Sequence, residues 1–239
     1  MSPMTDAPVA LKNRPRGRPH KSASDRALNA RRVELLRQAA RLFRAQGYAA
    51  STTREIAEAA GMQSGSPFYY FKSKGALLCE VMRDGMERAL RSQEHALRAL
   101  DSDTAPRTQL QVLIRQHLEV CVGADADFIP VMLLEWRALS PAQRARVTAQ
   151  KDQYEGIWMP VLSALHASGA LQVEPHIARL YIFGALNWAV RWFDPSGRLT
   201  LDDMAEQAVH LFLREDGPVD PSDKARRLAT GRHPRRQTE

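Results

Sequence analysis

Apolar residues recur at steps of three and four along the chain between residues 25 and 216, which is the spacing of amphipathic helices. Val33, Leu36, Ala40 and Phe43 place one apolar face on the first of these helices, and Gly47 is expected to end it. No segment alternates like a strand, and no internal repeat appears. The pattern therefore predicts an all-α fold with about nine helices.

Two short helices are predicted directly behind the first one. Thr52 and Glu55 have the spacing of a capping box, in which each side chain accepts a hydrogen bond from an otherwise unpaired backbone N–H. Gly61 is expected to end this helix after about two turns. A third helix is predicted from about Ser64 to Tyr70. Two short helices around a glycine, behind a longer helix, indicate a helix-turn-helix.

The remaining pattern predicts a helical bundle. Ser73 is expected to cap a long fourth helix reaching about Leu100, and Pro106 to open the next one. Later helices are predicted at 107–122, 128–138, 142–166, 175–193 and 201–214. We therefore divide the chain into a disordered basic arm (1–24), a helix-turn-helix domain (25–72), a helical effector-binding and dimerisation domain (73–216) and a disordered tail (217–239).

Charge separates these parts. Residues 1–72 hold 13 Lys and Arg against 5 Asp and Glu, whereas residues 73–213 hold 14 against 17. A basic first third on a mildly acidic remainder favours nucleic-acid binding by the first part. The alternative is a merely solvated basic surface.

The N-terminal helical part of the sequence resembles the DNA-binding domain of the tetracycline-repressor (TetR) family. The resemblance covers about residues 30–80 and rests on ordered, ungapped matches at Phe43, Gly47-Tyr48, Thr52-Thr53, Ile56-Ala57, Ala60-Gly61, Gly65, Tyr70-Phe71, Ser73-Lys74 and Leu77. Pro67, Phe68 and Ala76 depart from the family's usual residues. Pro67 would fall in the first turn of the third helix, where its missing N–H costs nothing.

The resemblance implies which residues meet double-stranded DNA. Residues expected near base edges are Gln63, Ser64, Ser66 and Tyr69, and those expected at phosphates are Thr53, Arg54, Tyr70 and Lys72. Ordinary packing is the alternative for the two tyrosines, and a solvated surface role for Lys72. The small core of this domain is expected to contain Val33, Leu36, Phe43, Ile56, Ala57, Ala60 and Phe71.

The basic arm carries a second motif. Arg16-Gly17-Arg18-Pro19 resembles an AT-hook, which lays arginines into narrow A·T-rich minor grooves with enhanced negative potential. We expect Arg16 and Arg18 to clamp the flanking minor groove. The alternative is nonspecific attraction by a disordered tail.

The second domain has aromatic and polar residues within its apolar runs, as a small-molecule site requires. The candidates for effector binding are His117, Trp136, Arg137, Tyr154, Trp158, Asn187, Trp188 and Arg191. Ordinary packing is the alternative for each. The stretch 184–200 resembles TetR regulators that respond to acyl-CoA thioesters, which implies a bulky CoA-linked effector.

The resemblance also implies a homodimer formed through the last two helices. Small residues there would permit close approach of helices, and larger apolar residues would supply buried area. The expected interface residues are Gly184, Ala185, Ala189, Met204, Ala208, Leu211 and Phe212. The alternative is that these faces only close the core of one chain.

These observations together predict a sequence-specific transcriptional regulator, more readily a repressor than an activator, that an effector releases from a palindromic operator. The rivals are an architectural DNA-binding protein, a helical binding module without DNA recognition, and an enzyme. Nucleophile-elbow, phosphate-loop and zinc-protease motifs are missing from the sequence, so we expect no catalytic residues, no cofactor and no metal. Two widely spaced cysteines and the lack of long apolar runs favour a cytoplasmic protein without membrane contact.

Overall fold

The computed structural model describes residues 23–63, 67–123 and 126–214, and these residues form helices and their connections without a strand. The helices are α1 (Ala23–Ala50), α2 (Thr53–Ala59), α3 (Pro67–Tyr70), α4 (Lys74–Arg98), α5 (Pro106–Val122), α6 (Phe128–Glu135), α7 (Pro141–Gly156), α8 (Trp158–Ala167), α9 (Pro175–Asn187) and α10 (Leu201–Phe212). Two short 3₁₀ helices, Trp136–Ala138 and Trp188–Arg191, follow α6 and α9. The all-α prediction is confirmed. The predicted tail, and the arm up to residue 22, lie outside the described residues.

Local signals set most helix ends in the first half of the chain. Thr52 and Glu55 form the predicted capping box, and the Ser73 hydroxyl accepts a hydrogen bond from the Ala76 N–H at 3.1 Å. Gly47 interrupts α1 with φ 82°, a left-handed backbone conformation that glycine adopts without steric cost. Gly61 follows α2 with φ 65°. These ends could be predicted because each depends on a few neighbouring residues.

Three predictions about helix continuity were wrong, and in the first of them, 128–138, the α-helix ends at Glu135 and a 3₁₀ turn follows. The segment 142–166 is two helices, α7 and α8, rather than one. Pro160 lacks the N–H that would bond to the carbonyl of Gly156, and glycine is itself a poor helix former. The segment 175–193 leaves the α-helical pattern after Asn187 and continues as a 3₁₀ turn.

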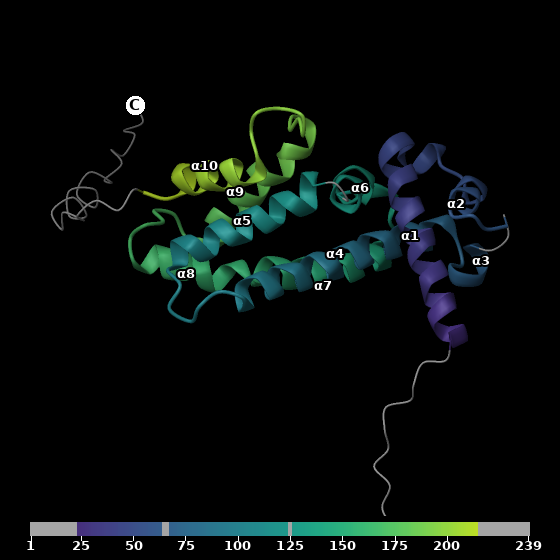
Figure 1. The fold of residues 1–239 in the computed structure, drawn as a ribbon, viewed down its shortest axis with the longest axis horizontal. Coiled ribbons are helices and arrows are strands. Elements are labelled where there is room, and N and C mark those ends of the chain that lie inside the picture. Colours follow the sequence, from purple (N-terminus) through teal and green to yellow (C-terminus); the bar gives the residue numbers. More distant parts are fainter. Residues whose placement is uncertain (1–22, 64–66, 124–125, 215–239) are drawn as a thin grey trace, which may run out of the picture.

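The helices form a head and a bundle joined by α4 (Figure 1). In the head, α1 packs against α2, α4 and α6, with Leu36, Phe43, Ile56, Ala57 and Phe71 buried as predicted. Val33 is 46% exposed, so its assignment to this core was wrong, and Ala60 is only partly buried. Val33 lies three residues before the buried Leu36, at the edge of the apolar face of α1.

The bundle is built around α4 and α5. The α4 helix runs away from the head beside α7, while α5 packs on α4, α8 and α10 (Figure 1). Close approach of α4 and α6 depends on Gly85, since a Cβ atom at this position would lie 2.1 Å from Cγ of Phe128. Because α4 packs on α1 at one end and extends beside α7, this one helix runs from the head into the bundle.

Candidate nucleic-acid interface and buried polar cluster

The head has the geometry of a helix-turn-helix. Helix α2 begins at the Thr52 capping box, in which the Glu55 carboxylate accepts the backbone N–H of Thr52 at 2.8 Å and the Thr52 hydroxyl oxygen accepts the N–H of Glu55 at 3.1 Å. After the left-handed Gly61, α3 begins at Pro67. The missing N–H of a proline at the first helical position has no intrahelical partner to lose.

Several predicted DNA contacts lie on the surface of this head. Gln63, Arg54, Tyr69 and Lys72 are exposed, Thr53 and Tyr70 are half-buried, and Tyr69 has 76% of its surface accessible. The Tyr69 and Tyr70 rings meet edge-to-face with centroids 5.1 Å apart. The Arg54 guanidinium is paired with the Glu58 carboxylate at 2.8 Å. Ser64, Ser66, Arg16 and Arg18 lie outside the described residues.

Lys74 fixes the head to the start of α4. Its ammonium donates to the carbonyl oxygens of Tyr48 and Ser51, each at 2.8 Å, and lies 4.3 Å from the centroid of the Tyr48 ring. It thereby satisfies one carbonyl in the last turn of α1 and one directly after the helix. The family match at Ser73-Lys74 flagged this position, but sequence alone gave it no role.

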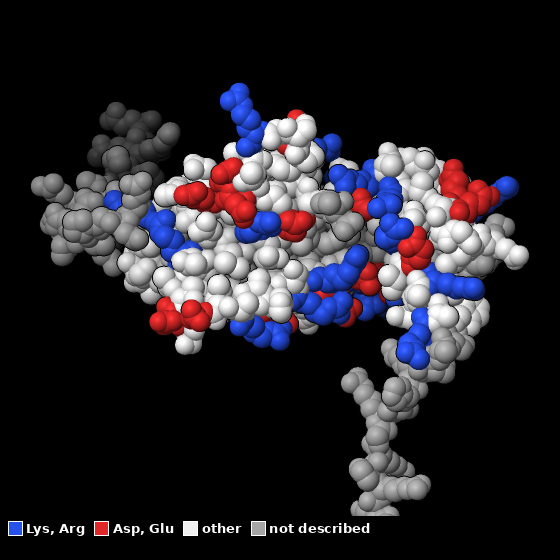
Figure 2. Space-filling view, in the orientation of Figure 1, with Lys and Arg blue, Asp and Glu red and all other residues white. Residues whose placement is uncertain are grey.

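Basic side chains gather on one visible face where the head meets the bundle. Figure 2 shows Lys and Arg, interspersed with acidic residues, over the head-proximal ends of α4 and α7. Many arginines are already paired, as Arg32 is with Glu80 at 2.8 Å and Arg44 is with Asp127 at 3.0 Å. Because the Glu80 and Asp127 carboxylates are mostly buried, these pairs join α1 to α4 and to the start of α6.

A cluster of uncharged polar side chains is buried in the bundle. His117 on α5 lies at its centre, with Nδ1 2.8 Å from the Tyr154 hydroxyl and Nε2 3.2 Å from Oδ1 of Asn187. The Trp158 indole N–H donates to the Gln93 side-chain oxygen at 3.2 Å. Four of the eight predicted effector residues, His117, Tyr154, Trp158 and Asn187, are thus brought together from α5, α7, α8 and α9.

The environment keeps this cluster neutral. Burial lowers the pKa of His117 to about 4, against the smaller opposing effect of its hydrogen bond to Asn187. Burial likewise raises the pKa of Cys121 to about 12 and raises the pKa of Tyr154 above its ordinary value. At neutral pH the cluster therefore presents an imidazole, a phenol, amides and a thiol, none of them charged.

The other four predicted effector residues lie apart from this cluster. Trp136 is half-buried and Arg137 exposed, both in the 3₁₀ turn after α6. Trp188 is 63% exposed, and the Arg191 guanidinium carbon lies 5.8 Å from its ring centroid. The sequence pattern cannot separate these residues from the buried four, since all eight lie in apolar helical stretches.

Sequence reasoning missed three members of the cluster. The Phe183 ring packs against those of both His117 and Trp158, with centroid distances of 4.9 and 4.7 Å. Cys121 Sγ lies 3.4 Å from Nε2 of His117, and the buried Gln93 amide nitrogen has no hydrogen-bond partner in the described part of the chain. A polar Gln93 on the apolar face of a predicted helix was the available signal.

An apolar groove of about 210 Å³ lies between α9 and α10. Six of the seven predicted dimer residues line it, namely Ala185, Ala189, Met204, Ala208, Leu211 and Phe212. Gly184 is exposed on α9, whereas Ala189 and Met204 are buried within the chain itself. Of the lining residues Trp192 and Leu211 are more than half exposed, and Leu180, Tyr181 and Trp188 are further exposed apolar side chains on α9 and the 3₁₀ turn after it.

Neither a metal site nor a membrane helix emerges from the described residues. In residues 23–63, 67–123 and 126–214, no three His, Cys, Asp or Glu side chains come together as metal ligands would. No helix among those residues has the length and hydropathy needed to cross a bilayer.

Comparison with known proteins agrees with this geometry. Residues 35–81 match the family model described as "Bacterial regulatory proteins, tetR family", and residues 103–228 match "Tetracyclin repressor-like, C-terminal domain". The transcriptional repressor KstR2 of Rhodococcus jostii (strain RHA1) is 30% identical over 195 residues, covering 80% of this chain and 92% of that protein.

Solved structures extend the likeness to the fold of about three quarters of the chain. The structure of AibR with isovaleryl coenzyme A and operator DNA has a TM-score of 0.67 at 26% identity, covering 76% of this chain and 97% of that one. The superantigen PfiT has a TM-score of 0.67 at 36% identity, with 78% and 98% coverage.

A helix-turn-helix head joined to an all-helical bundle defines this protein as a DNA-binding transcriptional regulator. With both of its parts matched, the chain belongs to the TetR family, which consists of regulators and not of enzymes.

Proposed function

We propose that this regulator is a dimeric repressor that a small-molecule effector releases from a palindromic operator. In this proposal residues 25–72 read DNA, residues 73–216 bind the effector and form the dimer, and the arm 1–24 and tail 217–239 flank them. The observation that carries it is the continuous α4 helix. Lys74, the first residue of α4, donates hydrogen bonds to the head. Gln93, near the other end of the helix, contacts the buried polar cluster.

For the DNA interface we retain the assignments made by position. Gln63, Ser64, Ser66 and Tyr69 would face base edges, while Thr53, Arg54, Tyr70 and Lys72 would hold phosphates. The exposure of Gln63, Tyr69 and Lys72 in the described head supports this. Arg54 would exchange its carboxylate partner Glu58 for a phosphate, since an exposed i,i+4 pair is weak.

For the effector we assign His117, Tyr154, Trp158 and Asn187 as the contacts, with Gln93 and Phe183 beside them. Because these groups are neutral at pH 7, they suit a carbonyl or hydroxyl group within an apolar skeleton better than a phosphate. An acyl-CoA would therefore place its acyl part and thioester carbonyl here, with its phosphates elsewhere. AibR, whose structure holds isovaleryl coenzyme A, supports this class of effector.

For the dimer we assign the α9 and α10 surface. Trp188, one of the predicted effector contacts, fits this surface better because it is 63% exposed in the 3₁₀ turn that directly follows α9. A stable homodimer requires burial of about 1,200 Å² or more in total. Pairing of two such grooves around a two-fold axis would hold two heads against two half-sites about one helical turn, or a multiple of it, apart.

The test measures the purified full-length protein on DNA from upstream of its own gene. We expect a footprint over one palindrome, with two chains bound, and release by at least one acyl-CoA from a panel of short, branched and steroid-like acyl chains. Broad coverage without a footprint would favour an architectural protein. Retention of the complex with every acyl-CoA would reject this effector class.

A further inference from the structure

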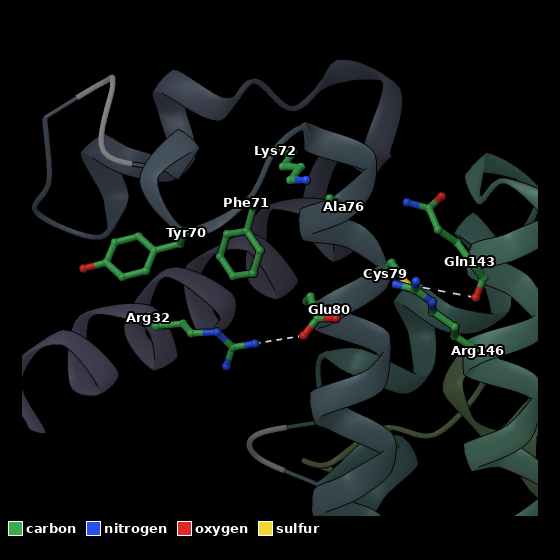
Figure 3. A pocket seen from close by; sticks show the side chains of 9 residues that line it. All are labelled: Arg32, Tyr70, Phe71, Lys72, Ala76, Cys79, Glu80, Gln143 and Arg146. Atoms are coloured by element: carbon green, nitrogen blue, oxygen red, sulfur yellow. Dashed lines mark hydrogen bonds and ion pairs between the residues drawn. The ribbon is translucent and has the colours of Figure 1, made fainter. Parts of the chain in front are cut away.

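A second cavity lies at the junction of the head and the bundle, away from the buried polar cluster. It has a volume of about 250 Å³ and is lined by residues from α1, the end of α3, the start of α4 and α7. Figure 3 shows Arg32 extending from α1 on one side and Arg146 from α7 on the other, with Phe71 and Glu80 between them. It is therefore a space that only the docked head and bundle create.

The lining of this cavity carries an excess of positive charge. Arg32, Lys72 and Arg146 contribute cations, and Glu80 is the acidic residue among the lining side chains. Both oxygens of the Glu80 carboxylate are already engaged, one by Arg32 and the other by Arg83. Neither Lys72 nor Arg146 has an ion-pair partner within the described residues. These two exposed cations can therefore take an anionic ligand without giving up an ion pair of the described residues.

One wall of the cavity is aromatic. Phe71 and Tyr70 line it, with ring centroids 6.4 Å apart, and the Arg32 guanidinium carbon lies 5.5 Å from the centroid of the Phe71 ring. The amide side chain of Gln143, which also lines the cavity, already has hydrogen-bond partners. Its nitrogen donates to the Gly75 carbonyl oxygen at 3.0 Å, and its oxygen accepts the Ser140 N–H at 2.9 Å. The lining therefore offers Lys72 and Arg146 as cations, and Tyr70 with the small exposed part of Phe71 as aromatic surface, beside the already paired Arg32.

We propose that this cavity binds a small aromatic anion, such as an aryl phosphate or an aryl carboxylate. Its anionic group would lie between Lys72 and Arg146, and its ring would pack on Tyr70 and the small exposed part of Phe71. A drug-sized pocket occupies about 300 Å³ or more, so a single-ring ligand matches the observed volume. The site is separate from the effector cluster, because Gln93 lies about 20 Å further along α4 than Glu80.

Occupation of the cavity would bear on DNA binding. Tyr70 and Lys72 line the cavity and are also among the residues assigned to DNA phosphates. A bound anion would engage the Lys72 ammonium and so compete with the operator. The test below uses protein without DNA or acyl-CoA, so that its outcome does not depend on the operator or on the effector.

The experiment is isothermal titration of the full-length protein with phenyl phosphate at constant ionic strength. We expect saturable binding of one molecule per chain, weakened about tenfold or more by Arg146→Gln and largely restored by Arg146→Lys. Arg144→Gln is the matched control, since it removes the same charge from the same helix at a residue outside the cavity lining. Circular dichroism checks that each variant remains folded, and Lys72→Gln provides a second variant at the other proposed contact of the anionic group.

Two ligand controls separate the contributions of charge and ring. Inorganic phosphate and phenol are each expected to bind at least about tenfold more weakly than phenyl phosphate, because each lacks one half of the recognition. The proposal is overturned if phenyl phosphate shows no saturable binding. It is also overturned if Arg144→Gln weakens binding as much as Arg146→Gln, or if inorganic phosphate binds as tightly as the ester.

Discussion

The Glu135 carboxylate accepts a hydrogen bond from the backbone N–H of Tyr48 at 3.0 Å, across 87 positions of sequence. Glu135 is the last residue of α6 in the bundle, and Tyr48 lies just after the left-handed Gly47 near the end of α1. The same carboxylate oxygen would lie 3.3 Å from a Cβ atom at Gly47. Head and bundle are thus joined at this point by a contact that tolerates little change.

We expect Glu135→Ala to lower the free energy of unfolding by about 1–2 kcal/mol, because a half-buried N–H would lose its charged acceptor. Urea unfolding followed by circular dichroism measures this. The control is Glu94→Ala, which removes a carboxylate from an exposed i,i+4 pair with Arg98 and should cost about 0.5 kcal/mol or less. Equal effects of the two substitutions would contradict a specific role for Glu135.

The crossing of α4 and α6 depends on the absence of a side chain at Gly85. Gly85→Ala should destabilise the protein by about 1–3 kcal/mol, because the new methyl group would overlap the Phe128 ring and outweigh the gain in helix propensity. In Gly156→Ala the added Cβ meets no atom within 4 Å, so that helical glycine should tolerate alanine with no loss of stability. Thermal unfolding of both variants tests the difference, and a stable Gly85→Ala protein would show that α6 can shift at little cost.

His117 should make stability depend on pH. Its pKa is lowered from 6.5 to about 4 in the folded protein, so between these values the unfolded state binds more protons. Stability is therefore full above about pH 6.5 and falls as the pH decreases toward 4, by roughly 3 kcal/mol from this group. His117→Gln should lose less stability between pH 7 and pH 5 than the natural chain does. Parallel pH profiles for the two proteins would exclude His117 as the cause.

Replacement of Lys72 by alanine should weaken DNA binding about equally on all sequences. If Lys72 neutralises a phosphate, the slope of log affinity against log salt concentration should also decrease, by about one for each subunit bound. Fluorescence anisotropy on operator and scrambled DNA at several salt concentrations gives both quantities. Lys151→Ala, which removes a cation from α7 in the bundle, is the control. An unchanged slope would remove Lys72 from the DNA interface.

Substitution of both Arg16 and Arg18 by alanine should reduce affinity most on operators with A·T-rich flanks, where the narrow minor groove concentrates negative potential. A variant with Lys12 and Lys21 replaced by alanine removes the same charge from the arm and leaves the Arg-Gly-Arg-Pro motif intact. It should lose affinity equally on all flanks. If the two double variants behave alike, the arm acts through nonspecific attraction only.

The sequence by itself determined the all-helical class, the helix-turn-helix and most helix ends in the head. Thr52 with Glu55, Gly47, Gly61 and Ser73 act on backbone groups only a few residues away, so their effects can be inferred without a tertiary structure. Ordered matches in residues 30–80 added the family for the same reason, since this unit is short and contiguous.

Only the tertiary structure decided which side chains of the bundle meet. Periodicity shows that a helix has an apolar face but not which helix covers it, and so it could not reveal that Val33 is exposed. His117 contacts Tyr154 and Asn187 across 37 and 70 positions, whereas Trp136 and Trp188, from equally apolar stretches, lie outside the cluster. The crossing angles and close approaches of whole helices set such contacts, and these depend on packing at sites such as Gly85 and Phe128 that are far apart in the chain.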